Sequence, residues 1–143
     1  MNKTLSENLY EGLKKVKITK VNKYLPVLNY AKLEFSNGEL TITTTDLENS
    51  YIAKVPCIMN DEFSTCVPMQ TRIDVSKTRC PVYHKIYPFM DFIEVCAEYR
   101  DVLEFTFDPK IQILTIKVQG ERSITEFKCI DAEEFPAIAA SLV

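Results

Sequence analysis

The sequence contains only three glycines and no tryptophan among its 143 residues. So few glycines argue against a glycine-rich phosphate-binding loop, and neither a Walker A nor a dinucleotide-binding fingerprint is present. No apolar run approaches the roughly 20 residues that span a bilayer, and the N-terminal residues lack the apolar core of a secretory signal. With 46% hydrophobic and 26% charged residues, the chain is expected to form one cytoplasmic globular domain over residues 1–143, with no membrane segment.

Histidine is equally scarce, because His84 is the single one. Most Ser/His and Cys/His nucleophilic schemes are thereby excluded. The five cysteines are irregularly spaced and include no CxxC pair, which argues against a zinc ribbon or a thioredoxin-like motif. A zinc set of Cys57, Cys66, Cys80 and His84 has a spacing that fits no familiar site, and free cysteines usually behave as small buried hydrophobes. We therefore expect no metal and no cofactor.

Asp46 and Glu48 are the remaining candidates for acid–base chemistry. They fall in the stretch TTTDLENSYIAKVP, Thr43–Pro56, where a polar turn separates two runs of alternating apolar and polar residues. No third group of a suitable type lies nearby, and aspartate in a turn commonly accepts backbone hydrogen bonds. The pattern predicts a structural turn and a protein without catalytic residues, so not an enzyme.

Charge is distributed unevenly along the chain. The net charge is −3 and the pI is near 5.3, so the chain as a whole lacks the excess of basic residues that a generic nucleic-acid-binding protein shows. Five lysines nevertheless occur from Lys14 to Lys23 without an acid, and a second basic stretch runs from Arg72 to Lys85. Acidic residues gather at Asp91–Glu104 and Asp131–Glu134. This separation indicates a basic face on an acidic body.

Hydrophobic periodicity predicts the order helix, four strands, helix, three strands. Thr4 and Glu7 have the spacing of a capping box before the first helix, and Asn37-Gly38 is a strong hairpin signal. The expected helices cover about 5–17 and 88–100, and the expected strands cover 31–35, 40–45, 50–55, 63–67, 103–107, 114–118 and 122–130. The repeated order indicates an α+β domain, with two helices packed on antiparallel sheets in a pseudo-twofold repeat of helix plus strands.

Four motifs occur in one register. They are Leu25-Pro26-Val27-Leu28, Asn37-Gly38, Thr45-Asp46-Leu47-Glu48 and Asp131-Ala132-Glu133-Glu134-Phe135-Pro136. On these motifs, from about residue 5 to 136, the chain resembles the first domain of the bacterial sliding clamp, the beta subunit of DNA polymerase III. Each motif alone is weak, and their common register carries the resemblance.

The resemblance implies a non-catalytic clamp-like domain that binds double-stranded DNA without sequence preference and acts as a processivity factor of DNA replication. In the family, basic side chains on the inner face of a ring meet phosphates loosely, and the ring tethers polymerase. The loop after the family's first helix bears a basic DNA contact; here the aligned residue is Asn22, so the assignment passes to its neighbours. The DNA-binding residues expected from the two basic stretches are Lys17, Lys20, Lys23, Arg72, Lys77 and Arg79.

Several features depart from the family pattern. The strand ahead of the first helix is expected to be shortened or absent, and residues 69–87 look like a basic insertion. The second helix is acidic, and the second and third domains, which form the pocket for partner peptides, have no counterpart in this sequence. The alternative function is a clamp-derived protein-interaction module that no longer encircles DNA and holds a partner through Tyr83, His84 and Tyr87. Open sheet edges predict self-association in either case.

Overall fold

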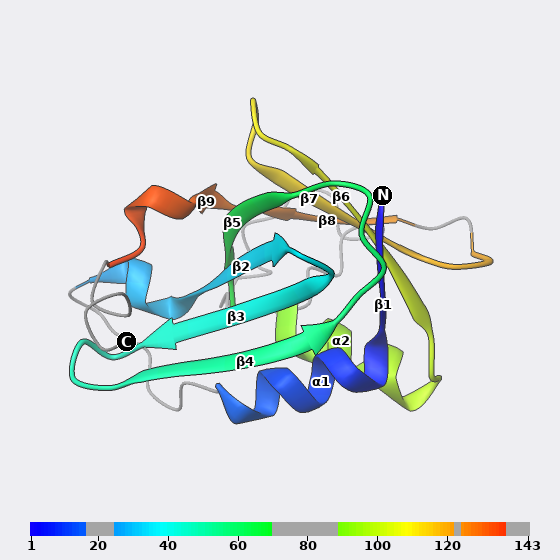
Figure 1. Ribbon diagram of the computed structural model, residues 1–143, viewed down its shortest axis with the longest axis horizontal. Helices are drawn as coiled ribbons and strands as arrows, with labels where there is room; N and C mark the ends of the chain where they lie inside the picture. Colours follow the sequence, from blue (N-terminus) through cyan, green and yellow to red (C-terminus); the bar gives the residue numbers. More distant parts are fainter. Residues whose placement is uncertain (17–24, 70–88, 122–123, 137–143) are drawn as a thin grey trace, which may run out of the picture.

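The computed structural model describes residues 1–16, 25–69, 89–121 and 124–136. In these residues two antiparallel sheets and a pair of α-helices form an α+β arrangement, as predicted (Figure 1). The helices lie side by side and pack against each other, and β4 runs along α1. Lys17, Lys20, Lys23 and residues 70–88 lie outside the described residues.

The four-stranded sheet has the order β1-β6-β7-β8, and the five-stranded sheet has the order β4-β3-β2-β5-β9. The helices are α1 (Ser6–Lys15) and α2 (Phe89–Glu98), with short 3₁₀ turns η1 (Pro26–Asn29) and η3 (Ala132–Glu134). The strands are β1 (Asn2–Leu5), β2 (Tyr30–Ser36), β3 (Glu39–Thr45), β4 (Ser50–Pro56), β5 (Phe63–Pro68), β6 (Val102–Asp108), β7 (Ile113–Val118), β8 (Ile124–Lys128) and β9 (Ile130–Asp131).

The predicted repeat is visible in the topology. Each repeat consists of a strand, a helix and a three-stranded meander: β1-α1-β2-β3-β4 and β5-α2-β6-β7-β8. The first strand of each repeat pairs with the other repeat's meander, because β1 joins β6 and β5 joins β2. The two repeats therefore hold each other together through both sheets as well as through their helices.

The packing of α1 follows from its apolar stripe. Leu9 and Leu13 are fully buried, and Gly12 lies so close to β4 that an added Cβ would stand 2.8 Å from a methyl carbon of Val55. Thr44 on β3 donates a hydrogen bond of 2.7 Å from its hydroxyl to the carbonyl oxygen of Val16, just after the helix. The glycine thus permits a close helix–sheet approach, and the threonine satisfies a carbonyl that the helix end leaves free.

Turn chemistry was predicted correctly at the β2–β3 hairpin. Asn37 and Gly38 both adopt positive φ, 54° and 76°, as a two-residue turn of type I′ requires. The strand faces also follow the predicted alternation, because Leu40 and Ile42 on β3 are buried together against the core. Local sequence therefore determines the register of this hairpin.

The start of the chain decides between the two alternatives for the first strand and corrects one prediction. The strand ahead of the first helix is present, as a short β1 whose Thr4 pairs with Leu103 on β6. The capping-box prediction for Thr4 and Glu7 is wrong: Leu5 occupies the N-cap without a side-chain bond, and the Thr4 hydroxyl donates to the Pro56 carbonyl at 3.1 Å. Pairing with β6 holds Thr4 in a strand, which removes it from the cap position.

The single strand expected at 122–130 is also wrong. The described part divides into β8 in the four-stranded sheet and β9 in the five-stranded sheet, with Cys129 between them. Cys129 donates its backbone N–H to the Gln112 carbonyl at 2.7 Å. The chain therefore crosses from one sheet to the other at this point and ties their edges together.

Candidate nucleic-acid interface

The turn at Asp46 is a closed backbone structure. The Asp46 Oδ1 atom accepts hydrogen bonds from the backbone N–H groups of Glu48 at 2.9 Å and Asn49 at 2.6 Å, while the Thr45 hydroxyl donates to the Asn49 carbonyl. Leu47 takes the left-handed conformation between them, with φ of 77°. The prediction of a structural turn is confirmed, because one carboxylate oxygen of Asp46 closes the turn with two backbone hydrogen bonds.

The same bonds make the turn sensitive to acid. The hydrogen bond from the Asn49 N–H group has the largest effect and lowers the pKa of Asp46 below its usual value, and the bond from the Glu48 N–H group lowers it further. A lowered folded pKa stabilises the fold above the unfolded value of about 4, and this contribution is lost as the pH falls through the folded pKa. We expect Asp46→Ala to be less stable than the wild type in urea unfolding at neutral pH, with a smaller deficit at an acidic pH below the folded pKa of Asp46. Asp46→Asn, which keeps an acceptor oxygen, is the control; an equal Ala deficit at both pH values would contradict this account.

The described cysteines are buried or half-buried thiols. Burial raises the pKa of Cys66 to about 12 and that of Cys96 and Cys129 to about 11, and it also raises the pKa of Cys57. A thiol with so high a pKa is a weak nucleophile and a weak metal ligand at neutral pH. Across residues 1–16, 25–69, 89–121 and 124–136, no cluster of three potential metal ligands occurs. Cys80 and His84 of the zinc set considered above lie outside these ranges.

None of the six candidate DNA-binding residues is in the described part of the chain, but the ends of their segments are. Lys17, Lys20 and Lys23 lie between Val16, at the end of α1, and Leu25, before η1. Arg72, Lys77 and Arg79 follow Met69, which ends the described stretch after β5. The prediction of these six residues as DNA contacts therefore stays a prediction.

The described ends of the two basic segments meet at one end of the five-stranded sheet. Tyr30 and Pro68 are paired in the β2–β5 ladder, and the Met69 N–H donates to the Asn29 carbonyl at 3.1 Å. The Val16 carbonyl is bound at the same sheet end, through Thr44 near the end of β3. The antiparallel order of β3, β2 and β5 thus brings together the points from which both basic segments leave.

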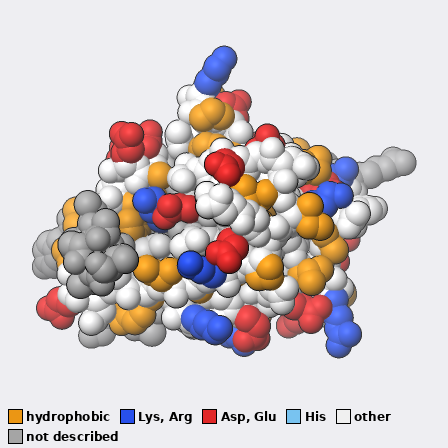
Figure 2. Space-filling model, viewed as in Figure 1, with side chains coloured by type: hydrophobic (Ala, Val, Ile, Leu, Met, Phe, Trp, Pro, Cys, Tyr) orange, Lys and Arg blue, Asp and Glu red, His pale blue; other side chains and the backbone are white. Residues whose placement is uncertain are grey.

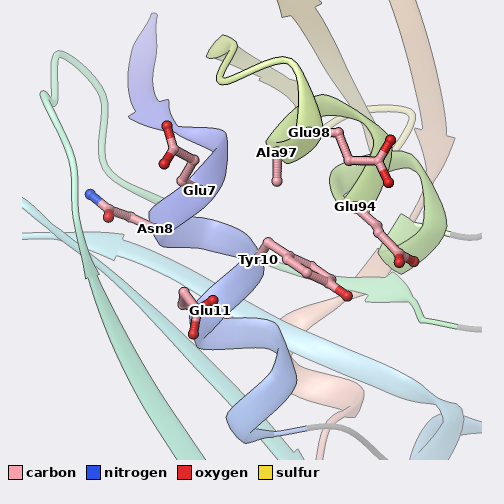
Figure 3. Close-up of a pocket in the computed structure, with 7 residues that line it drawn as sticks. All are labelled: Glu7, Asn8, Tyr10, Glu11, Glu94, Ala97 and Glu98. Atoms are coloured by element: carbon pink, nitrogen blue, oxygen red, sulfur yellow. The ribbon is translucent and has the colours of Figure 1, made fainter.

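A groove of about 400 Å³ lies between α1 and α2 (Figure 3). Tyr10 points from α1 toward α2, and Ala97 faces it from the second helix. The remaining lining side chains are Glu7, Asn8, Glu11, Glu94 and Glu98. Sequence periodicity placed Glu94 and Glu98 on an acidic helix face, but it did not reveal that Glu7 and Glu11 line the same groove.

The electrostatics of the helix pair are acidic. Its five acidic side chains and two lysines give a balance of −3. The Lys14 ammonium group lies 2.8 Å from Glu11 Oε1 and 4.9 Å from the centre of the Tyr10 ring. Burial, and next the charge of Glu94, raise the pKa of Tyr10. On the face seen in Figure 2, by contrast, acidic and basic side chains are interspersed.

Comparison with solved structures gives a consistent result. The sliding clamp (DNA polymerase III subunit beta) of Pseudomonas aeruginosa matches 95% of this chain with a TM-score of 0.68 and 20% sequence identity. The sliding clamp of Caulobacter crescentus matches the same share with a TM-score of 0.70 at 16% identity, and that of Bartonella birtlesii with 0.69 at 12%. No protein-family model and no curated protein matches the chain.

The likeness covers nearly all of this chain but only about a third of each solved clamp, 32% for the first two and 33% for the third. It rests on the arrangement of strands and helices, since identity is low. Among the described residues, no helix has the length and apolar character needed to cross a membrane. Because the arrangement of its strands and helices matches these clamps, the chain has the fold of a single domain of a bacterial DNA polymerase sliding clamp.

Proposed function

We propose that this chain is a non-catalytic clamp-like domain that binds duplex DNA without sequence preference and acts as a processivity factor in DNA replication. The observation that carries the proposal is the match of 95% of the chain to the sliding clamps, at TM-scores of 0.68 to 0.70 for the three clamps compared above. The DNA-contacting groups proposed are Lys17, Lys20, Lys23, Arg72, Lys77 and Arg79. Contacts to phosphates alone attract any duplex and carry no sequence information.

The shared exit point of the two basic segments supports this assignment. Both leave the described fold at the end of the five-stranded sheet that holds Tyr30 and Pro68. The proposed contacts belong to two segments that leave the fold at one place, and a local concentration of positive charge attracts phosphates even where the net charge of the chain is −3. Duplex DNA is the proposed partner of that surface, and the replicative polymerase is the proposed partner of the assembled clamp.

Assembly is proposed to use the sheet edges. β4 is a seven-residue edge strand, and Ile52 on it is 50% exposed. In the other sheet, β1 is an edge strand. Within the described residues, its outer side is covered at Lys3, which exchanges two backbone hydrogen bonds of 2.8 Å with Ile58. Because unpaired strand edges tend to pair with another chain or to be covered, we expect this domain to associate with further clamp domains, including copies of itself.

Fluorescence anisotropy with labelled duplexes of unrelated sequence tests the proposal. We expect equal dissociation constants for the duplexes, because contacts to phosphate do not distinguish base sequence. An affinity that differs strongly between two duplexes of equal length would contradict sequence-independent binding. Failure to bind any duplex would contradict the DNA-binding function itself.

A second candidate function is a protein-interaction module that does not encircle DNA. The observation in its favour is the acidic balance of the helix pair, −3, since helices line the DNA-facing surface of the clamp family that the chain resembles. Carboxylates on such a surface repel phosphates. This candidate predicts no duplex affinity at low salt, so the same titration separates the two functions.

A further inference from the structure

The tip of the β2–β3 hairpin is tied to the segment that follows β4. The Gly38 N–H donates to the Met59 Sδ atom at 3.2 Å, and the Cys57 N–H donates to the Gly38 carbonyl at 3.1 Å. Ile58, between these two residues, exchanges two backbone hydrogen bonds of 2.8 Å with Lys3 on β1. Both backbone polar groups of Gly38 are therefore held by one segment, and that segment is itself anchored on β1 (Figure 1).

The residues at this tip have the chemistry of a deamidation site. An asparagine followed by glycine deamidates readily, because glycine has no side chain that hinders attack of its own nitrogen on the asparagine amide. Asn37 and Gly38 are both exposed, and a Cβ added at Gly38 would meet nothing within 4 Å. Within the described residues the Asn37 side chain makes no hydrogen bond, so its amide is free to rotate. The surroundings of the side chain therefore permit the reaction.

We propose that Asn37 is a deamidation site and that the Met59 sulfur atom controls the rate of its reaction. In the first step the Gly38 nitrogen gives its proton to a solvent base and bonds to the Asn37 Cγ atom. The Cγ–N bond of the amide breaks, and its nitrogen takes up a proton and leaves as ammonia. Water then opens the succinimide ring at either carbonyl, which leaves aspartate or isoaspartate.

The contact with Met59 opposes the first step. The attacking nitrogen carries the N–H that donates to Met59 Sδ, so this hydrogen bond must break before the proton can leave. The peptide between Asn37 and Gly38 must also turn toward the Asn37 side chain, and the bonds on both sides of Gly38 resist that turn. The reaction therefore requires a local opening of the hairpin tip. Because a thioether is a weak acceptor, the strength of this one contact sets how often the tip opens.

Deamidation would change the turn that joins β2 to β3. Isoaspartate inserts one extra main-chain carbon into the two-residue turn, which lies next to the paired residues Ser36 and Glu39. A two-residue turn fixes the register of its hairpin. The isoaspartate product is therefore expected to loosen the pairing of β2 with β3, two central strands of the five-stranded sheet.

The test follows deamidation of the full chain at mildly alkaline pH, by mass spectrometry of its proteolytic fragments. Met59→Leu removes the sulfur acceptor and keeps an apolar side chain of similar volume. We expect this variant to deamidate at Asn37 about threefold to tenfold faster than the wild type, because one hydrogen bond favours the closed tip by that factor. Asn49, which is exposed and precedes Ser50, is the internal reference and should react at an unchanged rate. In concentrated urea the tip is open in both proteins, so their Asn37 rates should be equal.

Met90→Leu is the matched control, because it makes the same exchange on the buried face of α2 rather than at the hairpin tip. It should leave the Asn37 rate at the wild-type value. Equal Asn37 rates in the folded wild type and folded Met59→Leu would overturn the proposal. Equal acceleration by Met90→Leu would also overturn it, because the effect would then belong to a general loss of stability. The proposal does not rest on DNA binding, which is measured separately.

Discussion

Phe35→Ala is expected to lower the free energy of unfolding by about 3–5 kcal/mol. Phe35 on β2 is 1% exposed, and its ring lies 4.6 Å from that of Phe63 on β5 and 5.4 Å from that of Phe105 on β6, measured between centroids. It therefore joins the five-stranded sheet to the four-stranded sheet. Removing it leaves a cavity where the two repeats meet and also removes the tilted aromatic contacts of its ring with its two neighbours.

Urea denaturation with fluorescence or circular dichroism detection measures this change. A domain of this kind has a total stability of about 5–15 kcal/mol, so the decrease is a large share of it. Tyr99→Ala is the control, since a side chain 74% exposed should change stability by less than about 0.5 kcal/mol. A Phe35→Ala deficit as small as that of the control would show that the two sheets are not held together at this ring.

Reversing the charge of Lys17, Lys20 and Lys23 to Glu is expected to weaken duplex binding about 100-fold or more. Each lysine that neutralises a phosphate releases counterions, and the log–log salt slope becomes shallower by about 0.9 for each phosphate that is no longer neutralised. The variant should therefore bind more weakly and with a slope reduced by about 2.7. Anisotropy titrations at several salt concentrations give both quantities.

A matched triple variant separates position from net charge. Lys54, Lys110 and Lys128 are exposed on β4, the β6–β7 turn and β8, away from the exit points of the basic segments. Their reversal to Glu changes the net charge by the same amount. We expect this variant to retain much more of the affinity. Equal weakening in the two triple variants would contradict the assignment of Lys17, Lys20 and Lys23.

Most of the fold was predictable from alternation and turn residues. Leu40 and Ile42 indicated the period of β3, and Asn37-Gly38 indicated its hairpin with β2. β1 was harder, because Asn2–Leu5 is short and Thr4 also fits a helix cap. The conformation of β1 is decided by its pairing with β6, about a hundred residues away in the sequence, which places Thr4 opposite Leu103. Tertiary pairing of this kind leaves no local signal.

The candidate site was predictable only in part. The turn role of Asp46 followed from its residue type and its neighbours, and the backbone hydrogen bonds confirm it. The acidic face of α2 was visible as a helical stripe that includes Glu94 and Glu98. The groove was not visible, because it requires that Tyr10 on α1 face Ala97 on α2. A sequence indicates the apolar and polar faces of each helix but not which faces meet.

The central claim, that this clamp-like domain binds duplex DNA through phosphate contacts, is tested most directly by the salt dependence of wild-type binding. Anisotropy of one labelled duplex would be titrated at a series of salt concentrations. The account predicts tight binding at low salt and a linear fall of log affinity with log salt, with a slope of up to about −5.4 if all six basic residues contact phosphates. No binding at low salt, or an affinity that does not change with salt, would contradict it.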